Sequence, residues 1–150
     1  MASRLLLLAT GFSLAACGGE PATDDPGTTT TETDAPRPTV TIVSPAEGDT
    51  VDGPAVTVQL AVDGLRIVLA GDTTPGTGHH HLYLDDDLTP GDMPIPTVPG
   101  RIIHMGDGST EYTFEDVTPG DHRLIAVVGD GVHVPLQPWV VDTVHFTVRR

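Results

Sequence analysis

The sequence predicts an all-β protein, an antiparallel β-sandwich of about seven strands that follows a disordered tether. Short β-branched segments of alternating polarity begin at residue 39 and are separated by clusters of turn-forming residues. The 17 glycines and 14 prolines in 150 residues oppose long helices. No stretch carries a helical period of apolar residues. An open Greek-key barrel is the alternative architecture that the same pattern allows.

The predicted strands follow one another along the domain. Val56, Val58, Leu60 and Val62 alternate with other residues, as on a strand with one buried face. Asp63 and Gly64 then predict a hairpin turn, and a short apolar run follows at 65–70. The predicted strands span residues 39–43, 56–62, 78–85, 101–105, 111–114, 122–128 and 140–148.

Two segments resemble parts of bacterial immunoglobulin-like domains. Residues 43–58 resemble the opening strands of such domains, and residues 117–127 resemble the corner that enters their strand F. A Tyr often occupies the position of His122 in that corner, so the resemblance implies that His122 bonds back to the preceding turn. Segment 85–100 contains four prolines and predicts a long ordered loop, a kind of loop that is often functional.

The first 38 residues predict export and anchoring. Residues 1–16 have the charge, apolar run and small residues of a signal peptide. Small residues before Cys17 resemble a bacterial lipobox, which implies a lipid on Cys17 and a membrane partner. An ordinary signal peptide with a free thiol is the alternative. Residues 17–38 predict a disordered linker rich in Thr, Pro and Asp, and residues 39–150 predict the folded domain.

The composition limits where the protein works and what it binds. Seven basic residues stand against 21 acidic ones, giving a net charge of −14, which excludes binding to nucleic acid by counterion release. With the lipobox, we expect a lipid-anchored protein of the bacterial cell envelope. Gly18 follows the lipidated position, where some bacteria place an Asp to retain lipoproteins at the inner membrane. We therefore expect the outer membrane, with the domain facing the periplasm.

The histidines predict the site. All seven lie between residues 79 and 145, inside the predicted domain. On a strand, His79 and His81 project from one face about 7 Å apart, a spacing at which two imidazoles can share a metal ion. His80 then shares the opposite face with Leu82 and Leu84. His104 and His133 adjoin glycine-rich turns, and we expect the sandwich to bring them to the same place.

These four histidines, His79, His81, His104 and His133, are the predicted ligands of Cu or Zn, since imidazole suits both ions. His80, Asp85 and His122 are predicted to support the ligands or the fold, with Asp85 as the first choice to accept a hydrogen bond from a metal-bound imidazole. Imidazole titrates near pH ~6.5, so we expect mild acid to release the metal. A hydrogen-bonded histidine network without metal is the alternative.

The acidic run of Asp85, Asp86 and Asp87 with Asp92 raises the possibility of a calcium site, but its spacing fits no EF-hand loop. A solvated acidic loop is the better interpretation. Nucleophile motifs, phosphate loops and dinucleotide fingerprints are absent from the sequence, so we expect a protein that is not an enzyme.

Five motifs in order resemble the domain of unknown function 4399 family, small exported bacterial domains with a Gly-His-His-His motif. They are GHHHLYLD at 78–85, MPIP at 93–96, IHMGDGSTE at 103–111, PGDHRL at 119–124 and GDGVHVP at 129–135. The resemblance covers residues 40–148. It implies that the histidines at 79, 80, 81, 104, 122 and 133 and Asp85 occupy recurrent positions. Ile102 replaces the first histidine of a His-x-His pair that the family commonly shows.

The sequence thus favours an envelope-anchored lipoprotein that binds Cu or Zn for capture or buffering. The first alternative is a non-enzymatic immunoglobulin-like adaptor that binds an envelope protein or glycan and uses its histidines structurally. A metalloenzyme with three histidines and a metal-bound water is the second, and it requires an open coordination position and a cleft.

Overall fold

The computed structural model describes residues 36–150, and this part of the chain is all-β, as predicted. The predicted signal peptide, Cys17 and most of the predicted linker lie outside the described residues. No helix among residues 36–150 is long and apolar enough to cross a membrane. The strands in this range are β1 (Thr39–Ser44), β2 (Thr50–Asp52), β3 (Val56–Asp63), β4 (Arg66–Ile67), β5 (Thr77–Leu84), β6 (Ile102–Met105), β7 (Glu111–Phe114), β8 (Gly120–Gly129) and β9 (Val141–Arg149).

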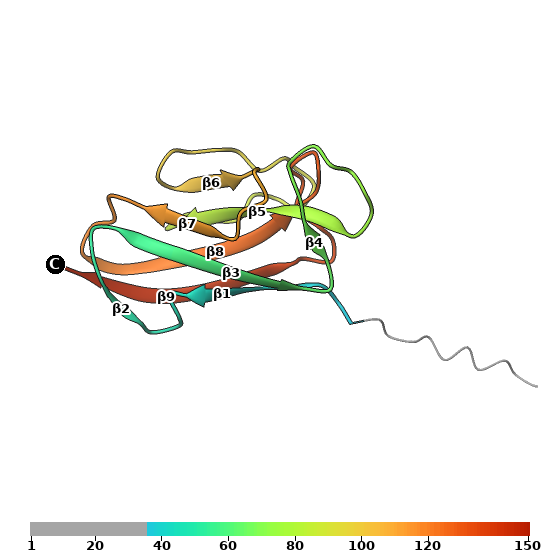
Figure 1. The fold of residues 1–150 in the computed structure, drawn as a ribbon. Coiled ribbons are helices and arrows are strands. Elements are labelled where there is room, and N and C mark those ends of the chain that lie inside the picture. Colours follow the sequence, from blue (N-terminus) through green and yellow to red (C-terminus); the bar gives the residue numbers. More distant parts are fainter. Residues whose placement is uncertain (1–35) are drawn as a thin grey trace, which may run out of the picture. The chain divides into compact units, whose positions relative to one another are not determined.

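The strands form two sheets (Figure 1). The smaller sheet has the order β1-β3-β7, and the larger has the order β2-β9-β8-β5-β4, with β6 also paired to β5. Apolar side chains of both sheets meet in one main core, which includes Val58, Phe114, Leu82, Leu124 and Phe146. Two separate sheets with a shared core make a sandwich rather than an open barrel.

Three details differ from the prediction. The pairing is not wholly antiparallel, because β2 runs parallel to β9 and β4 runs parallel to β5. These two short strands are also the ones that the sequence did not predict, since three and two residues are too few to show a period. The turn at Asp63 and Gly64 does not make a hairpin. It carries the chain from β3 in the smaller sheet to β4 in the larger one.

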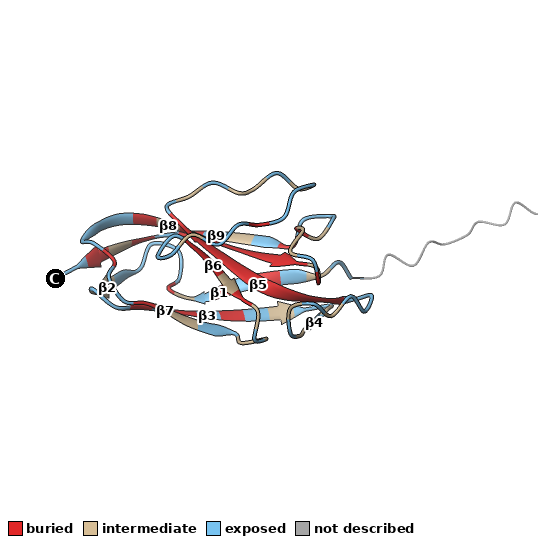
Figure 2. Cartoon of the chain, turned by 90° about the horizontal axis from the view of Figure 1, so that it is seen from above, coloured by how far each residue is buried: buried red, intermediate tan, exposed pale blue. Residues whose placement is uncertain are grey.

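Strand β3 shows the alternation that the sequence predicts. Val56, Val58 and Leu60 are buried, while the residues between them are exposed (Figure 2). Strand β5 differs, because all eight of its residues are buried. One face of β5 packs into the main core, and the part of the other face around Tyr83 is covered by the long segment between β5 and β6.

A second apolar cluster lies under that segment, on the outer face of the larger sheet. It joins Tyr83 of β5, Ile102 of β6 and two residues of β8, Ile125 and Val127, to Ile95 of the covering segment. The hydroxyl of Tyr83 also lies 3.0 Å from the hydroxyl oxygen of Thr89 in the segment. The predicted long loop is therefore an ordered cover, and it leaves the next part of the outer face, around His79 and His81, for the site.

Candidate metal centre

Strand β5 carries two imidazoles to the outer face of the larger sheet. His79 and His81 have the same parity as Tyr83, whereas Leu82 and Leu84 of the opposite parity lie in the main core. Both histidines are fully buried. Their Nε2 atoms lie 3.1 Å apart.

The third and fourth imidazoles come from β6 and from the turn after β8. His104 is the cross-strand partner of His81, so the two side chains lie on one face. His133 has a backbone φ of 70°, a left-handed conformation that is uncommon outside glycine and costs of order 1–3 kcal/mol. The carboxylate of Asp130 fixes this turn by accepting hydrogen bonds from the backbone N–H groups of Val132 and Val134, both at 2.9 Å.

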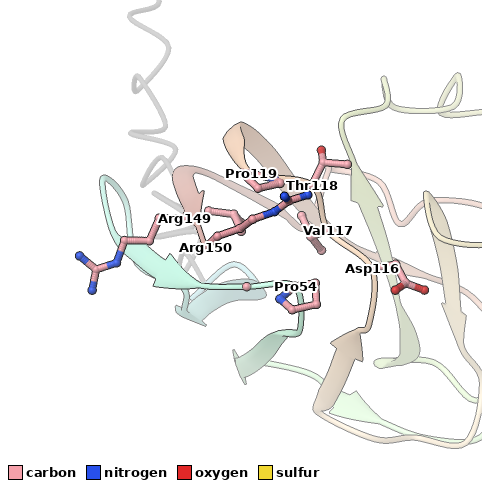
Figure 3. A pocket seen from close by; sticks show the side chains of 9 residues that line it. Pro54, Asp116, Val117, Thr118, Pro119, Arg149 and Arg150 are labelled. Carbon is pink, nitrogen blue, oxygen red and sulfur yellow. The ribbon is translucent and has the colours of Figure 1, made fainter.

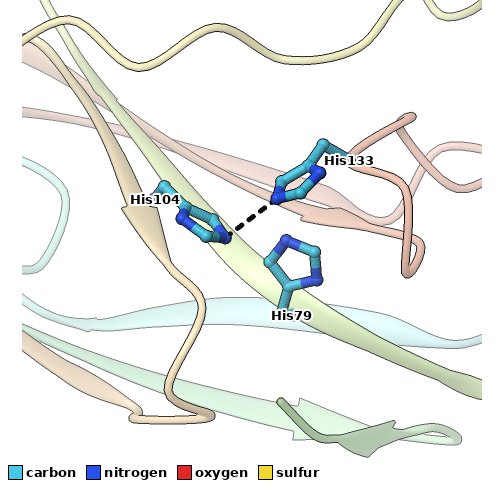
Figure 4. Close-up of side chains that lie close together, drawn as sticks. All are labelled: His79, His104 and His133. Atoms are coloured by element: carbon cyan, nitrogen blue, oxygen red, sulfur yellow. Dashed lines mark hydrogen bonds between the residues drawn. The ribbon is translucent and has the colours of Figure 1, made fainter. Parts of the chain in front are cut away.

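The side chains of these elements converge on one point (Figure 4). The Nε2 atoms of His104 and His133 lie 3.2 Å apart. One ring nitrogen from each of His79, His104 and His133 lies within 4.8 Å of the others. The ring of His81 has its centroid 4.8 Å from that of His79 and 5.2 Å from that of His104. The structure thus brings together all four predicted ligands, with His81 deepest.

Two of the distances between ring nitrogens lie near those on a tetrahedral ion. With Zn–N bonds of about 2.0–2.1 Å, two imidazole nitrogens on a tetrahedral ion are about 3.3–3.4 Å apart. The two close pairs, at 3.1 Å and 3.2 Å, lie near that length. The group of His79, His104 and His133 could hold a metal ion once ring nitrogens that now lie within 4.8 Å of one another move closer together.

Burial keeps the deep imidazoles neutral. Desolvation, followed by the neighbouring imidazoles His104 and His133, lowers the pKa of His79 to about 4. Desolvation, with smaller effects of the other histidines, lowers the pKa of His81 to about 3. Desolvation also lowers the pKa of His104. A neutral imidazole has the free lone pair that a metal requires. We therefore expect protonation of His79 and His81 to release a bound metal at a pH well below 6.5, the value near which the sequence analysis places release.

Two ring nitrogens of the site have no protein partner. The Nδ1 atoms of His79 and His81 are buried without a hydrogen bond to any described residue. Leaving a buried polar group unpaired costs about 1–3 kcal/mol. His80 in the main core shares this feature, and an ion bound through the Nε2 atoms would leave both Nδ1 atoms unpaired.

His80 points away from the site, as its parity predicts. It lies fully buried on the same face as Leu82 and Leu84, and neither of its ring nitrogens has a partner among residues 36–150. Desolvation lowers the pKa of His80 to about 4, so the ring is neutral at pH 7. Its place is in the main core and not among the four converging imidazoles.

Asp85 and His122 form a separate structural unit. His122 Nδ1 lies 2.7 Å from Asp85 Oδ2, and His122 Nε2 lies 2.7 Å from the carbonyl oxygen of Thr118. The second contact is the bond back to the preceding turn that the corner resemblance implies. Asp85 also accepts a hydrogen bond from the backbone N–H of Arg123 at 2.9 Å. Asp85 therefore holds the corner and does not orient one of the four imidazoles, contrary to its prediction as a partner of a ligand.

The acidic run at the end of β5 is neutralised by arginines. Asp86 pairs with Arg101 at 3.1 Å, and Asp87 pairs with Arg123 at 2.6 Å. Carboxylates that pair with arginine are poor candidates for calcium ligands. The acidic run is therefore a surface loop, as interpreted from the sequence, and two of its carboxylates form salt bridges with arginines.

Sequence reasoning missed two glycines that make room for the rings. A Cβ on Gly106 would lie 2.3 Å from His104 Cε1, and a Cβ on Gly129 would lie 3.1 Å from His81 Nε2. It also missed Ile95, whose backbone N–H donates to the carbonyl oxygen of His133 at 2.8 Å. The contact of Gly129 depends on the pairing of β8 with β5, and that of Ile95 on where the covering segment lies, neither of which a single sequence reveals.

A further concavity of about 310 Å³ lies beside the end of β9 (Figure 3). Its wall includes Pro54, Val117 and Pro119, together with Arg150. Arg149, which also lines it, donates to Asp52 at 2.7 Å. The lining contains no histidine, so the converging imidazoles remain the candidate site of the described residues.

Comparison with known families identifies the domain. The sequence model of a domain of unknown function, DUF4399, matches residues 58–149, which include all four converging histidines. The chain belongs to this family. None of the curated proteins compared with the chain matches it. A crystal structure of an engineered protein, a structural genomics target, is similar over 76% of this chain and 20% of that chain, with 14% identity and a TM-score of 0.42. The chain thus spans about a fifth of that protein's length.

Proposed function

We propose that this DUF4399 protein binds one Cu²⁺ or Zn²⁺ ion and captures or buffers it in the bacterial cell envelope. His79, His104 and His133 would be the first three ligands, and His81 the fourth. The protein would act as a binding protein and not as an enzyme. A lipid on Cys17 would hold it at the membrane, in keeping with the lipobox resemblance.

The convergence of neutral imidazoles carries this proposal. Three histidines from β5, β6 and the turn after β8 present ring nitrogens within 4.8 Å of one another. The close contacts between these rings, at 3.1 Å and 3.2 Å, join Nε2 atoms, so ring nitrogens that would bind an ion already face one another. The left-handed backbone of His133 adds a conformational cost that a bound ion would offset.

The donor set favours Cu²⁺ or Zn²⁺ over Cu⁺. Cu⁺ prefers thiolates and thioethers, but Cys17 is the only cysteine in the chain and is the predicted lipid site. Met105 packs into the main core, on the opposite face of β6 from His104. Imidazoles alone suit the divalent ions.

Metal titration tests the proposal. The purified protein, produced without a polyhistidine tag, is titrated with Cu²⁺ and with Zn²⁺ against a competing chelator. We expect one ion per chain, with a Kd near micromolar or tighter, and loss of binding in the variant that combines His79→Ala with His81→Ala. His145→Ala is the matched control, because His145 is an exposed imidazole on β9. We expect it to leave binding unchanged.

Weak binding that the double variant does not alter would refute a metal site. The four histidines would then brace the cover over the outer face, and the adaptor function, with an envelope protein or glycan as partner, would become the leading hypothesis.

A further inference from the structure

We propose that the metal ion enters and leaves through the open cavity beside His104, and that Asp107 on the wall of this cavity attracts the hydrated cation. This inference rests on the proposed function. It adds a route and a steering residue that the four ligands by themselves do not specify.

Burial restricts the approach to the site. His79 and His81 are fully buried, so an ion cannot meet them first. His104 and His133 are partly exposed. The first imidazole that an incoming ion meets must therefore be one of these two.

Backbone contacts from two other segments surround the turn that carries His133. The N–H of Ile95 donates to the carbonyl oxygen of His133 at 2.8 Å, which pins the covering segment onto this turn. On its other side, the turn after β8 contacts the segment between β4 and β5: a Cβ on Gly131 would lie 2.4 Å from the carbonyl oxygen of Asp72. The N–H of Gly71 also donates to the carbonyl oxygen of Gly131 at 3.1 Å.

The side of His104 is open. A cavity of about 510 Å³ is lined by His104, Gly106, Asp107, Ser109 and Tyr112, together with Met105. One water occupies about 30 Å³ in the liquid, so an ion with six waters needs about 200 Å³ and fits. The lining of imidazole, carboxylate, hydroxyl and phenol groups can exchange hydrogen bonds with those waters while they leave.

Asp107 presents a negative charge on this route. One carboxylate oxygen, Oδ1, accepts the backbone N–H of Ser109 at 2.9 Å, which fixes the side chain. The Ser109 hydroxyl, followed by its backbone N–H, lowers the pKa of Asp107, and the residue is exposed, so its charged carboxylate can meet a hydrated cation. Arg101 and Arg123 are paired with the acidic run beyond the far end of β5 and do not line this cavity. Arg66 of β4 pairs with Thr77 near the His79 end of β5, but it interacts with Asp72 and does not line the cavity either. Asp107 is therefore the charged residue of the cavity wall, and it favours the approach of a cation.

Association and dissociation rates test the route of entry independently of Kd. Trp139 is the only tryptophan, and its quenching by Cu²⁺ alone can be followed by stopped flow. Ser109→Phe narrows the cavity without touching the ligands. We expect it to lower the association and dissociation rates by the same factor and to leave Kd unchanged, because both directions use one route. Thr143→Phe, an exposed position on β9, is the matched control.

Asp107→Asn tests the steering charge. We expect the association rate to fall about three- to five-fold at low ionic strength and to match that of the wild type in 1 M salt, with the dissociation rate unchanged. Glu115→Gln is the control, because Glu115 lies beside Leu84 at the opposite end of β5. We expect it to leave both rates unchanged.

The outcomes are distinguishable. If the wild type binds no Cu²⁺, the proposed function fails and the route fails with it. If the wild type binds Cu²⁺ but Ser109→Phe and Asp107→Asn both keep the wild-type association rate, the route is wrong and the site stands. A faster dissociation rate in Asp107→Asn would make Asp107 a ligand and would overturn its steering role.

Discussion

Replacing Gly106 with alanine probes the site without removing a ligand. The added Cβ would lie 2.3 Å from Cε1 and 2.5 Å from Nε2 of His104, and 3.1 Å from Cβ of Ala70. Ordinary carbon contacts begin near 3.4 Å, so the imidazole must move by about 1 Å. Gly106 has no left-handed φ, and the backbone itself therefore tolerates alanine.

That displacement is large for a metal ligand. Ligand distances hold within about 0.2 Å in well-formed sites, so a shift of about 1 Å takes His104 out of the coordination sphere or forces the ion off centre. Changes just outside the ligands typically cost 10- to 100-fold in metal affinity. We expect Gly106→Ala to weaken Cu²⁺ or Zn²⁺ binding by about that factor, or about 1.4–2.8 kcal/mol.

Competition titration against a chelator of known affinity measures this change, with circular dichroism to confirm that the fold is intact. Gly91→Ala is the matched control, because its Cβ would meet only the flexible end of Gln137 and the edge of Trp139. An unchanged Kd in a folded Gly106→Ala protein would show that the position of His104 does not matter for binding, and would refute the reasoning.

Three further changes have defined outcomes. His80→Leu should stabilise the metal-free protein at pH 7 by about 1–2 kcal/mol, because it removes two unpaired buried nitrogens from the core; destabilisation in denaturant melts would mean that the ring has a partner. Burial lowers the pKa of His80 to about 4, so the unfolded chain binds more protons than the folded one between pH 6.5 and pH 4. Acidification through this range should therefore lower the free energy of unfolding of the wild type by about 3 kcal/mol through His80. His80→Leu should not show this part of the loss. His122→Ala should cost about 2–3 kcal/mol, since it removes two hydrogen bonds and a buried ring that packs near Phe146, and it should leave metal affinity unchanged. A parallel loss of affinity in the titration would place His122 in the site. Because burial lowers the pKa of His79 to about 4, the protein should retain its bound metal at pH 5 and lose it between pH 5 and pH 3. Equilibrium dialysis measures this release, and half-release near pH 6.5 would contradict metal binding by the buried histidines.

Much of the fold could be predicted because strands have a simple period. The alternation of Val56, Val58 and Leu60 placed one face of β3 in the core, and the same parity separated His80 from its two neighbours. The covering loop followed from its prolines. The short parallel strands β2 and β4 could not be predicted, because two or three residues carry no period.

The site could be predicted only in part, for a related reason. Strand parity and the family resemblance identified the four imidazoles, and the structure brings them together. Nothing in the sequence pairs His104 with His81 or places Gly129 opposite His79, because these are contacts across strands. Asp85 was predicted to accept a hydrogen bond from a metal-bound imidazole, whereas the structure places it just beyond the end of β5, beside His122.

X-ray absorption at the metal edge tests the central claim most directly. The protein is loaded with one equivalent of Cu²⁺ or Zn²⁺, and the first coordination shell is measured. We expect three or four nitrogen ligands at about 2.0–2.1 Å, with the outer-shell scattering of imidazole and no sulfur. A shell made of oxygen, or with a single imidazole, would contradict a site built from His79, His81, His104 and His133.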